Sequence, residues 1–249
     1  MRKLIFILGL FVCAWSFGQG LSPGIVASAK TIGASWDTTG IFSDGDTKGW
    51  YIADTNNYTT VGDTAISQWD DMSGTDNHLD MSNTTFQPKY LSTPDRVSFD
   101  GGYQYMAVAS FVYSQPNIVY VVWKQVSYVT NDFLMRFRSS PMVKLTQKTN
   151  ANTISATSLF YSTDEPTADT WVIQRFVWNG SSSKIQLNVN DAVTGDVGIG
   201  DFSYFRLPDI DNNVAAELEI REIIIRNAND SDATQANIMG YLNSKYSIY

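Results

Sequence analysis

Three glutamates lie close together near the end of the chain, at Glu217, Glu219 and Glu222. Two carboxyl groups held about 5–5.5 Å apart can hydrolyse a glycosidic bond with retention, one as nucleophile and the other as general acid and base. The run Leu218–Arg226 is β-type, and successive side chains of a strand point to opposite faces. Glu217 and Glu219 then share one face and Glu222 takes the other, unless a bulge at Arg221 realigns them. We expect this alternation to exclude a hydrolase site, so the sequence predicts no catalytic residues.

Few other residues are available for catalysis or metal binding. The 249-residue chain has one histidine, His78, one cysteine, Cys13, and a formal net charge of −8 at pH 7. A single cysteine allows neither a disulfide framework nor a cysteine-based zinc site. His78 lies in a turn rich in Asp and Asn without a G-x-S-x-G motif, so we interpret it as a solvated turn residue. The negative charge argues against a nucleic-acid partner held in a basic groove.

Acidic residues are concentrated in the first third of the chain. Asp70, Asp71 and Asp76 are the calcium candidates, since loop carboxylates and carbonyls supply the oxygen ligands that calcium needs. Neither EF-hand spacing nor a glycine-rich nonapeptide repeat accompanies them, and Asp and Asn also favour surface turns. No metal site is therefore predicted, and calcium is the one cofactor that the sequence leaves open.

Candidates for ligand binding come from two predicted strands. Sugar recognition uses aromatic faces for stacking and planar polar side chains for hydroxyl groups. Trp123 and Lys124 occur in the β-branched run Ile118–Val126, and Arg136 and Arg138 follow in the next strand. These four residues are the predicted ligand-binding set.

The N-terminus has the composition of a secretory signal peptide. Arg2 and Lys3 precede the apolar run Leu4–Val12, and small residues flank a cleavage position after Gly18. This run is too short for the ~20 residues that a membrane span needs, and no other segment reaches that length. We therefore expect a protein that is secreted or on the cell surface, with no transmembrane segment in the mature chain. The predicted organisation is a signal peptide over 1–18, an N-terminal arm or first strand over 19–40, and a single β domain over 41–249.

The rest of the chain predicts an all-β domain closed by one helix. Ile118–Val126 is apolar on both faces, which is typical of a central strand. Phe133–Arg138 alternates between apolar and basic side chains, and Leu218–Arg226 is the last strong strand. Trp171–Trp178 and Lys184–Val189 are expected to form a hairpin across a glycine-containing loop. The closing helix is capped by Ser231 or Asp232 and carries Gln235, Ile238, Leu242 and Tyr246 at helical spacing.

Several short motifs, taken in order, resemble those of a known superfamily. The motifs are Trp69-Asp70-Asp71-Met72-Ser73-Gly74, Phe99-Asp100-Gly101, Glu222-Ile223-Ile224-Ile225-Arg226-Asn227 and Tyr241-Leu242-Asn243-Ser244-Lys245-Tyr246. Over about Trp50 to Tyr246 the chain resembles the laminin-G-like, concanavalin A-like lectin/glucanase superfamily in its bacterial and phage form. The resemblance implies a concanavalin A-like jelly-roll sandwich of two antiparallel sheets with a short C-terminal helix. The laminarinase-like branch has a catalytic strand E-x-D-x-x-E, in which Glu219 here replaces the central Asp.

This superfamily hosts binding and catalytic proteins alike, so the fold alone does not select a function. We expect an exported, non-catalytic, lectin-like module that recognises a glycan or surface polysaccharide, or acts in adhesion. The first alternative is a phage virion surface or fibre-associated protein, with neighbouring structural proteins of the assembly as partners. The second is a β-glucan hydrolase, in the form of a retaining glycoside hydrolase.

Overall fold

The computed structural model describes residues 39–249 except 63, 128–132, 140–141, 149–150, 163, 165 and 210–214. The predicted signal peptide, and nearly all of the predicted arm, lie outside the described residues. Within them the chain is rich in β-strands and ends in one long helix, which confirms the predicted all-β class. No helix in this described part is long and apolar enough to cross a membrane.

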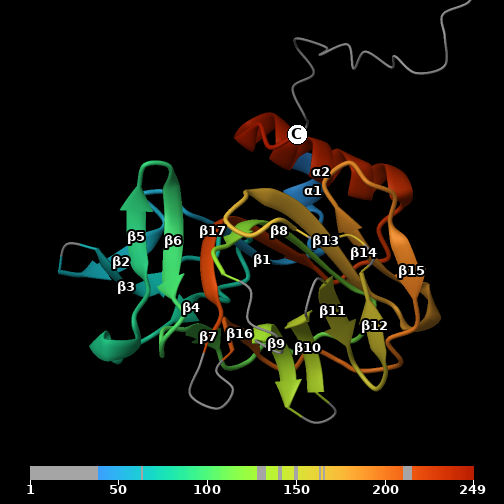
Figure 1. The fold of residues 1–249 in the computed structure, drawn as a ribbon, viewed down its shortest axis with the longest axis horizontal. Helices are drawn as coiled ribbons and strands as arrows, with labels where there is room; N and C mark the ends of the chain where they lie inside the picture. The colour runs from blue at the N-terminus through green and yellow to red at the C-terminus, as the bar shows by residue number, and fades with distance from the viewer. Residues whose placement is uncertain are drawn as a thin grey trace, which may run out of the picture. The chain divides into compact units, whose positions relative to one another are not determined.

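A continuous series of antiparallel strand pairings runs through the molecule (Figure 1). It begins at β15 and passes through β14, β13 and β8 to β17, which then pairs with β1 along one half and with β6 along the other. β13 and β14 are the predicted hairpin. The bounds of these strands are β15 (Val193–Gly195), β14 (Ser183–Leu187), β13 (Val172–Trp178), β8 (Asn117–Gln125), β17 (Glu217–Arg226), β1 (Thr47–Ile52) and β6 (Asp95–Asp100).

From β6 the pairings continue through β5, β3, β4, β7, β16, β9, β10 and β11 to β12, and β2 pairs with β3. These strands are β5 (Lys89–Ser92), β3 (Ala65–Trp69), β4 (Leu79–Asp80), β7 (Met106–Val108), β16 (Phe205–Leu207), β9 (Phe133–Ser139), β10 (Met142–Lys148), β11 (Ala151–Ser155), β12 (Leu159–Tyr161) and β2 (Tyr58–Val61).

The two ends of this series meet, so the sheet is nearly closed. The carbonyl of Val197, just after β15, accepts hydrogen bonds from the amides of Ala156 and Ser158, just before β12. Gly195 lies so close to the Phe160 ring that a Cβ would overlap it, which explains the glycine. The pairings thus form one sheet folded back on itself, where the resemblance implied two separate sheets.

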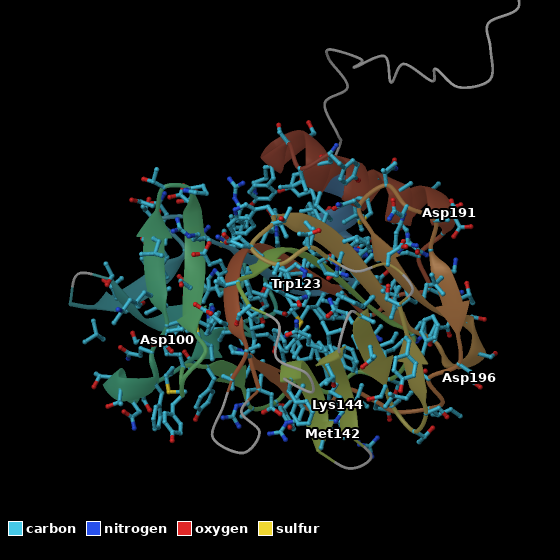
Figure 2. All side chains as sticks on the ribbon, viewed as in Figure 1. Asp100, Trp123, Met142, Lys144, Asp191 and Asp196 are labelled. Carbon is cyan, nitrogen blue, oxygen red and sulfur yellow. The ribbon has the colours of Figure 1, made fainter. Side chains whose placement is uncertain are left out.

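The inner face of the sheet encloses the main hydrophobic core. Val119, Val121 and Trp123 of β8 point into it, while the alternate residues Tyr120 and Val122 belong to a second core on the outer face. Figure 2 places Trp123 in the middle of the packed side chains. β8 is therefore a central strand buried on both faces, as its uniformly apolar sequence predicts.

The closing helix α2 (Asp232–Tyr246) covers the outer face of β8 and β13. Its N-cap is Ser231, whose side chain accepts the hydrogen bond of the Thr234 amide, as one of the two predicted caps. Ile238 and Leu242 are fully buried in the second core, which confirms the predicted apolar face. The short helical turns are α1 (Thr39–Ser43), η1 (Thr84–Phe86) and η2 (Gly180–Ser182).

Candidate functional site

The three glutamates of β17 do not alternate as predicted, because the strand contains a bulge. Its pairing with β8 shifts register between Ile220 and Glu222, which leaves Arg221 as the extra residue. Ile220 and Ile223 both point into the main core, so Glu219 and Glu222 both lie on the outer face. Leu218 also points into the main core, so Glu217 shares the outer face with Glu222. The expected separation of Glu217 and Glu222 onto opposite faces is therefore wrong, and the strand contains the bulge at Arg221 that was the alternative.

Helix α2 closes over Glu222, which is fully buried. Its carboxylate accepts hydrogen bonds from Trp50 Nε1 at 2.7 Å, Tyr241 OH at 3.2 Å, Lys245 Nζ at 2.7 Å and Tyr246 OH at 2.6 Å. Burial raises the pKa of both tyrosines, and the negative charge of Glu222 raises it further. Glu222 therefore fastens β17 to α2, and its buried oxygens are not accessible to a ligand.

Cations on neighbouring strands surround Glu219. Its Oε2 lies 2.9 Å from Arg96 Nε and 3.0 Å from Lys124 Nζ, and Lys124 Nζ also lies 2.7 Å from Asp169. Burial alone lowers the pKa of Lys124, but its bonds to Asp169 and Glu219 outweigh burial and raise it. Lys124, one of the predicted ligand residues, is therefore already paired with two carboxylates of its own chain.

The structure separates the four predicted ligand residues. Trp123 is fully buried and its indole N–H donates to Gln174 Oε1 at 2.9 Å, so a sugar cannot stack on it. Lys124 lies on the outer face, where it pairs with Glu219 and Asp169. Arg136 and Arg138 share β9, in another part of the sheet. Only these two arginines are brought together.

Arg136 belongs to a row of cations that crosses three adjacent strands, and we call this row the cationic face: Arg136 on β9, Lys144 on β10 and Arg206 on β16. The register places Arg136 opposite both Lys144 and Arg206. Like charges directly opposite each other destabilise a sheet. The fully buried Asp209 offsets this, because its Oδ1 lies 2.7 Å from Arg136 Nη2 and 3.5 Å from Arg206 Nη1. Figure 2 shows Lys144 on the edge of the molecule opposite α2.

Tyrosine rings accompany both guanidinium groups of the cationic face. Arg206 Cζ lies 3.8 Å from the ring centroid of Tyr105, and Arg136 Cζ lies 5.7 Å from that of Tyr204. Such cation–π contacts fix the plane of each guanidinium group. Arg206 and both tyrosines are not among the residues that the sequence predicts. The alternation in Phe205–Leu207 indicates that Arg206 points away from the core, but nothing local indicates that β16 lies beside β9.

The three calcium candidates do not converge on one point. Asp71 is mostly buried and its oxygens accept five hydrogen bonds. The donors are the backbone amides of Trp50, Ser73 and Asn77 and the hydroxyls of Ser73 and Thr75. Asp70 instead accepts from Gln68, and Asp76 is exposed. Among the described residues no group of three or more His, Cys, Asp or Glu side chains is placed to hold a metal. Calcium is thus still the one cofactor that the sequence leaves open.

No family model and no curated protein matches the chain, but solved structures do. Domain 4 of AbnA, a GH43 extracellular arabinanase from Geobacillus stearothermophilus in complex with arabinotriose, is 14% identical with a TM-score of 0.59, over 78% of this chain and 98% of that one. The Trypanosoma rangeli sialidase in complex with 2,3-difluorosialic acid is 9% identical with a TM-score of 0.58, over 81% of this chain and 33% of that one. A GH54 α-L-arabinofuranosidase is 12% identical with a TM-score of 0.58, over 80% of this chain and 63% of that one. The chain thus spans about a third of the sialidase.

These matches correct the expectation that the chain is not an enzyme. The three solved structures with this fold come from a sialidase, an arabinanase and an arabinofuranosidase, all of them carbohydrate-processing enzymes. At 9–14% identity the similarity is one of fold. The β fold of this chain is therefore one that also occurs in glycoside hydrolases, and it does not exclude enzymatic activity.

Proposed function

We propose that the chain is a glycan-binding module that holds carbohydrate on the cationic face of Arg136, Lys144 and Arg206. The observation that carries the proposal is the cation–π contact between guanidinium groups and tyrosine rings, that of Arg206 with Tyr105 and that of Arg136 with Tyr204. Sugar sites combine aromatic faces, which cover the apolar side of a ring, with planar polar groups that bond hydroxyls. The similarity of fold to domains of carbohydrate-processing enzymes supports the same reading.

The charge of the cationic face favours an acidic glycan. Arg136 and Arg206 share one carboxylate, that of Asp209, so these two guanidinium groups exceed their common partner by one positive charge. Guanidinium groups bind carboxylates with two parallel hydrogen bonds, which a neutral sugar cannot match. We therefore expect polygalacturonate to bind more tightly than arabinan, and salt to weaken the binding.

Affinity electrophoresis in gels with either polymer tests the proposal. Arg206→Met removes one cation and its contact with Tyr105, while Asp209 keeps Arg136 as a partner. The matched control is Lys89→Met, which removes one positive charge from an exposed position on β5. We expect the first variant to bind polygalacturonate about tenfold more weakly and the control to bind like the unmodified protein. Equal retardation of both variants would contradict the proposal.

Glycoside hydrolysis is the second candidate function, because the matched structures come from glycoside hydrolases. Release of reducing ends from polygalacturonate, arabinan or laminarin would support hydrolysis. Absence of release from all three polymers would leave glycan binding as the function.

We also propose that the sheet is of the concanavalin A-like type and that the chain is exported. The order of motifs between Trp50 and Tyr246 supports the fold type, and Glu222 links two of these motifs by bonding both tyrosines of the closing helix. The charged and apolar N-terminus supports export. Sequencing of protein recovered from culture medium should find Gln19 as the first residue. A cell-retained chain that still begins at Met1 would contradict export.

A further inference from the structure

A pocket of about 510 Å³ lies on the outer face of the sheet, between β13, β14 and α2. Arg175 of β13, Gln186 of β14 and Met239 of α2 contribute to its wall, and the loop that follows β14 supplies Asn188 and Asp191. Figure 2 shows Asp191 beside the helix, far from Lys144 of the cationic face. The pocket is therefore separate from the cationic face.

Arg175 is a buried cation that has no ion-pair partner among the described residues. The residue is 6% exposed, and its Nε is buried without a hydrogen-bond partner. In the described part of the chain its guanidinium group forms neither an ion pair nor a hydrogen bond. Tyr120, its neighbour across the sheet on β8, also has a buried hydroxyl without a partner. Burial lowers the pKa of Arg175, and Tyr120 and Asp232 offset this only in part.

The charges around the pocket leave Arg175 available to an anion. Lys184 lies 3.2 Å from Asp232, so these two neutralise each other at the rim. Asp191 is exposed to solvent. A buried guanidinium group without a partner is unfavourable, and a carboxylate that forms two hydrogen bonds with it removes the penalty.

We infer that this pocket binds the carboxylate of a small acidic sugar, with Arg175 as the residue that pairs with it. The volume lies within the range of small-ligand sites, which is about 300–1,000 Å³. Three side-chain amides also line the pocket, and each already has one hydrogen bond within the protein: Gln186 Nε2 donates to Asn190 O, Asn188 Oδ1 accepts from Ile173 N, and Asn190 Nδ2 donates to Asp164 Oδ2. The other polar atom of each amide suits a sugar hydroxyl. The inference uses no residue of the cationic face, so it stands apart from the proposed function.

Calorimetric titration with monomeric galacturonate tests this assignment, with its uncharged methyl ester and inorganic sulfate as comparison probes. Arg175→Met removes the cation and keeps a side chain of similar length. Gln186→Glu places a carboxylate directly opposite Arg175 in the sheet, so that the protein fills its own site. Lys89→Met, which removes one positive charge from an exposed position on β5, is the matched control, and Arg206→Met reports on the cationic face. Thermal midpoints of all variants show whether each is folded.

We expect galacturonate to bind the unmodified protein and Lys89→Met alike, and its affinity to fall about 10- to 100-fold in Arg175→Met and in Gln186→Glu. The ester and sulfate should bind more weakly than galacturonate, since one lacks the charge and the other the sugar. Absence of galacturonate binding, its retention in folded Arg175→Met, or equal binding of sulfate would overturn the inference. Loss in Arg206→Met alone would move the acidic sugar to the cationic face, which would overturn the pocket assignment and leave the proposed function standing.

Discussion

Arg226 and Arg175 are both buried arginines on the outer face of the sheet, with exposures of 1% and 6%, but their surroundings differ. Arg226 donates to Asp230 through Nε and Nη2, to Asp44 through both Nη atoms, and to Thr47. Burial alone lowers the pKa of Arg226, but the bonds to Asp230 and Asp44 outweigh burial and raise it. Arg175 has no such partner in the described part of the chain, and burial lowers its pKa.

The difference indicates that the charge of Arg226 is structural and that the charge of Arg175 is available to a ligand. Asp230 follows Arg226 by four residues and Asp44 precedes β1, so folding itself brings the counter-charges to Arg226. The neighbours of Arg175 across the sheet are Tyr120 and Gln186, and neither carries a charge that would offset its own. The same residue type therefore stabilises the fold in one place and favours an anionic ligand in the other.

The largest expected effect is that of Arg226→Met. The substitution leaves Asp230, whose side chain is 5% exposed, buried without its cation. Breaking a buried ion pair by removing one partner costs about 3–5 kcal/mol, so we expect the free energy of unfolding to fall by that amount. Urea denaturation with an unchanged m-value measures it. A loss no larger than that of Arg206→Met, whose ion pair is partly exposed, would show that Arg226 is not a structural charge.

Glu222→Gln tests the other buried charge of β17, with a smaller expected effect. The amide keeps the shape of the side chain but weakens the bonds from Lys245 and from the two tyrosines of α2. Lys245 is 32% exposed and stays solvated, so we expect a loss of about 2 kcal/mol in the free energy of unfolding. Glu217→Gln on the same strand is the control, with a change below about 0.5 kcal/mol. Equal losses in both variants would contradict the role of Glu222 in docking the helix.

Alkaline pH should weaken the same contact between β17 and α2. Tyr241 and Tyr246 have folded-state pKa values raised above the ordinary value of 10.0, first by burial and then by Glu222. The unfolded chain therefore loses these protons at lower pH than the folded one, and their stabilising contribution is complete below about pH 10 and declines above it. Thermal midpoints measured from pH 8 to pH 11 should fall more steeply for the unmodified protein than for Tyr246→Phe. Thermal midpoints that fall equally with pH in both proteins would show that Tyr246 does not contribute to the pH dependence of stability.

The strands and the closing helix were predictable because their signals are local. The apolar run of β8 and the cap at Ser231 each depend on a few adjacent residues. The bulge at Arg221 was predicted only as an alternative, because the alternation of β17 looks regular on both sides of it. A sequence shows which residues alternate, but the register shift depends on the partner strand.

The candidate sites were predictable only in part. Arg136 was identified from its own strand, whereas Arg206 joins it only through the pairing of β9 with β16, far apart in the sequence. Trp123 was selected for its aromatic face, but its side chain points into the main hydrophobic core. Nothing in the sequence indicates that Arg175 lines a pocket, because the pocket forms only where α2 lies beside β13 and β14. Long-range packing decides which polar residues are left without a partner.

The smallest expected effect, and the one of opposite sign, is that of Arg175→Met on stability without ligand. Replacing a buried charge by an apolar side chain of similar volume is neutral or stabilising, so we expect the free energy of unfolding to rise by about 0–1 kcal/mol. Gln186→Glu should also stabilise the protein, because it supplies the missing carboxylate opposite Arg175. In the double variant the glutamate has no guanidinium group to pair with, and its stabilising effect should disappear. Urea denaturation of the four proteins measures this coupling. A loss of stability in Arg175→Met as large as that in Arg226→Met would show that the two arginines have the same structural role, and the distinction between them would fail.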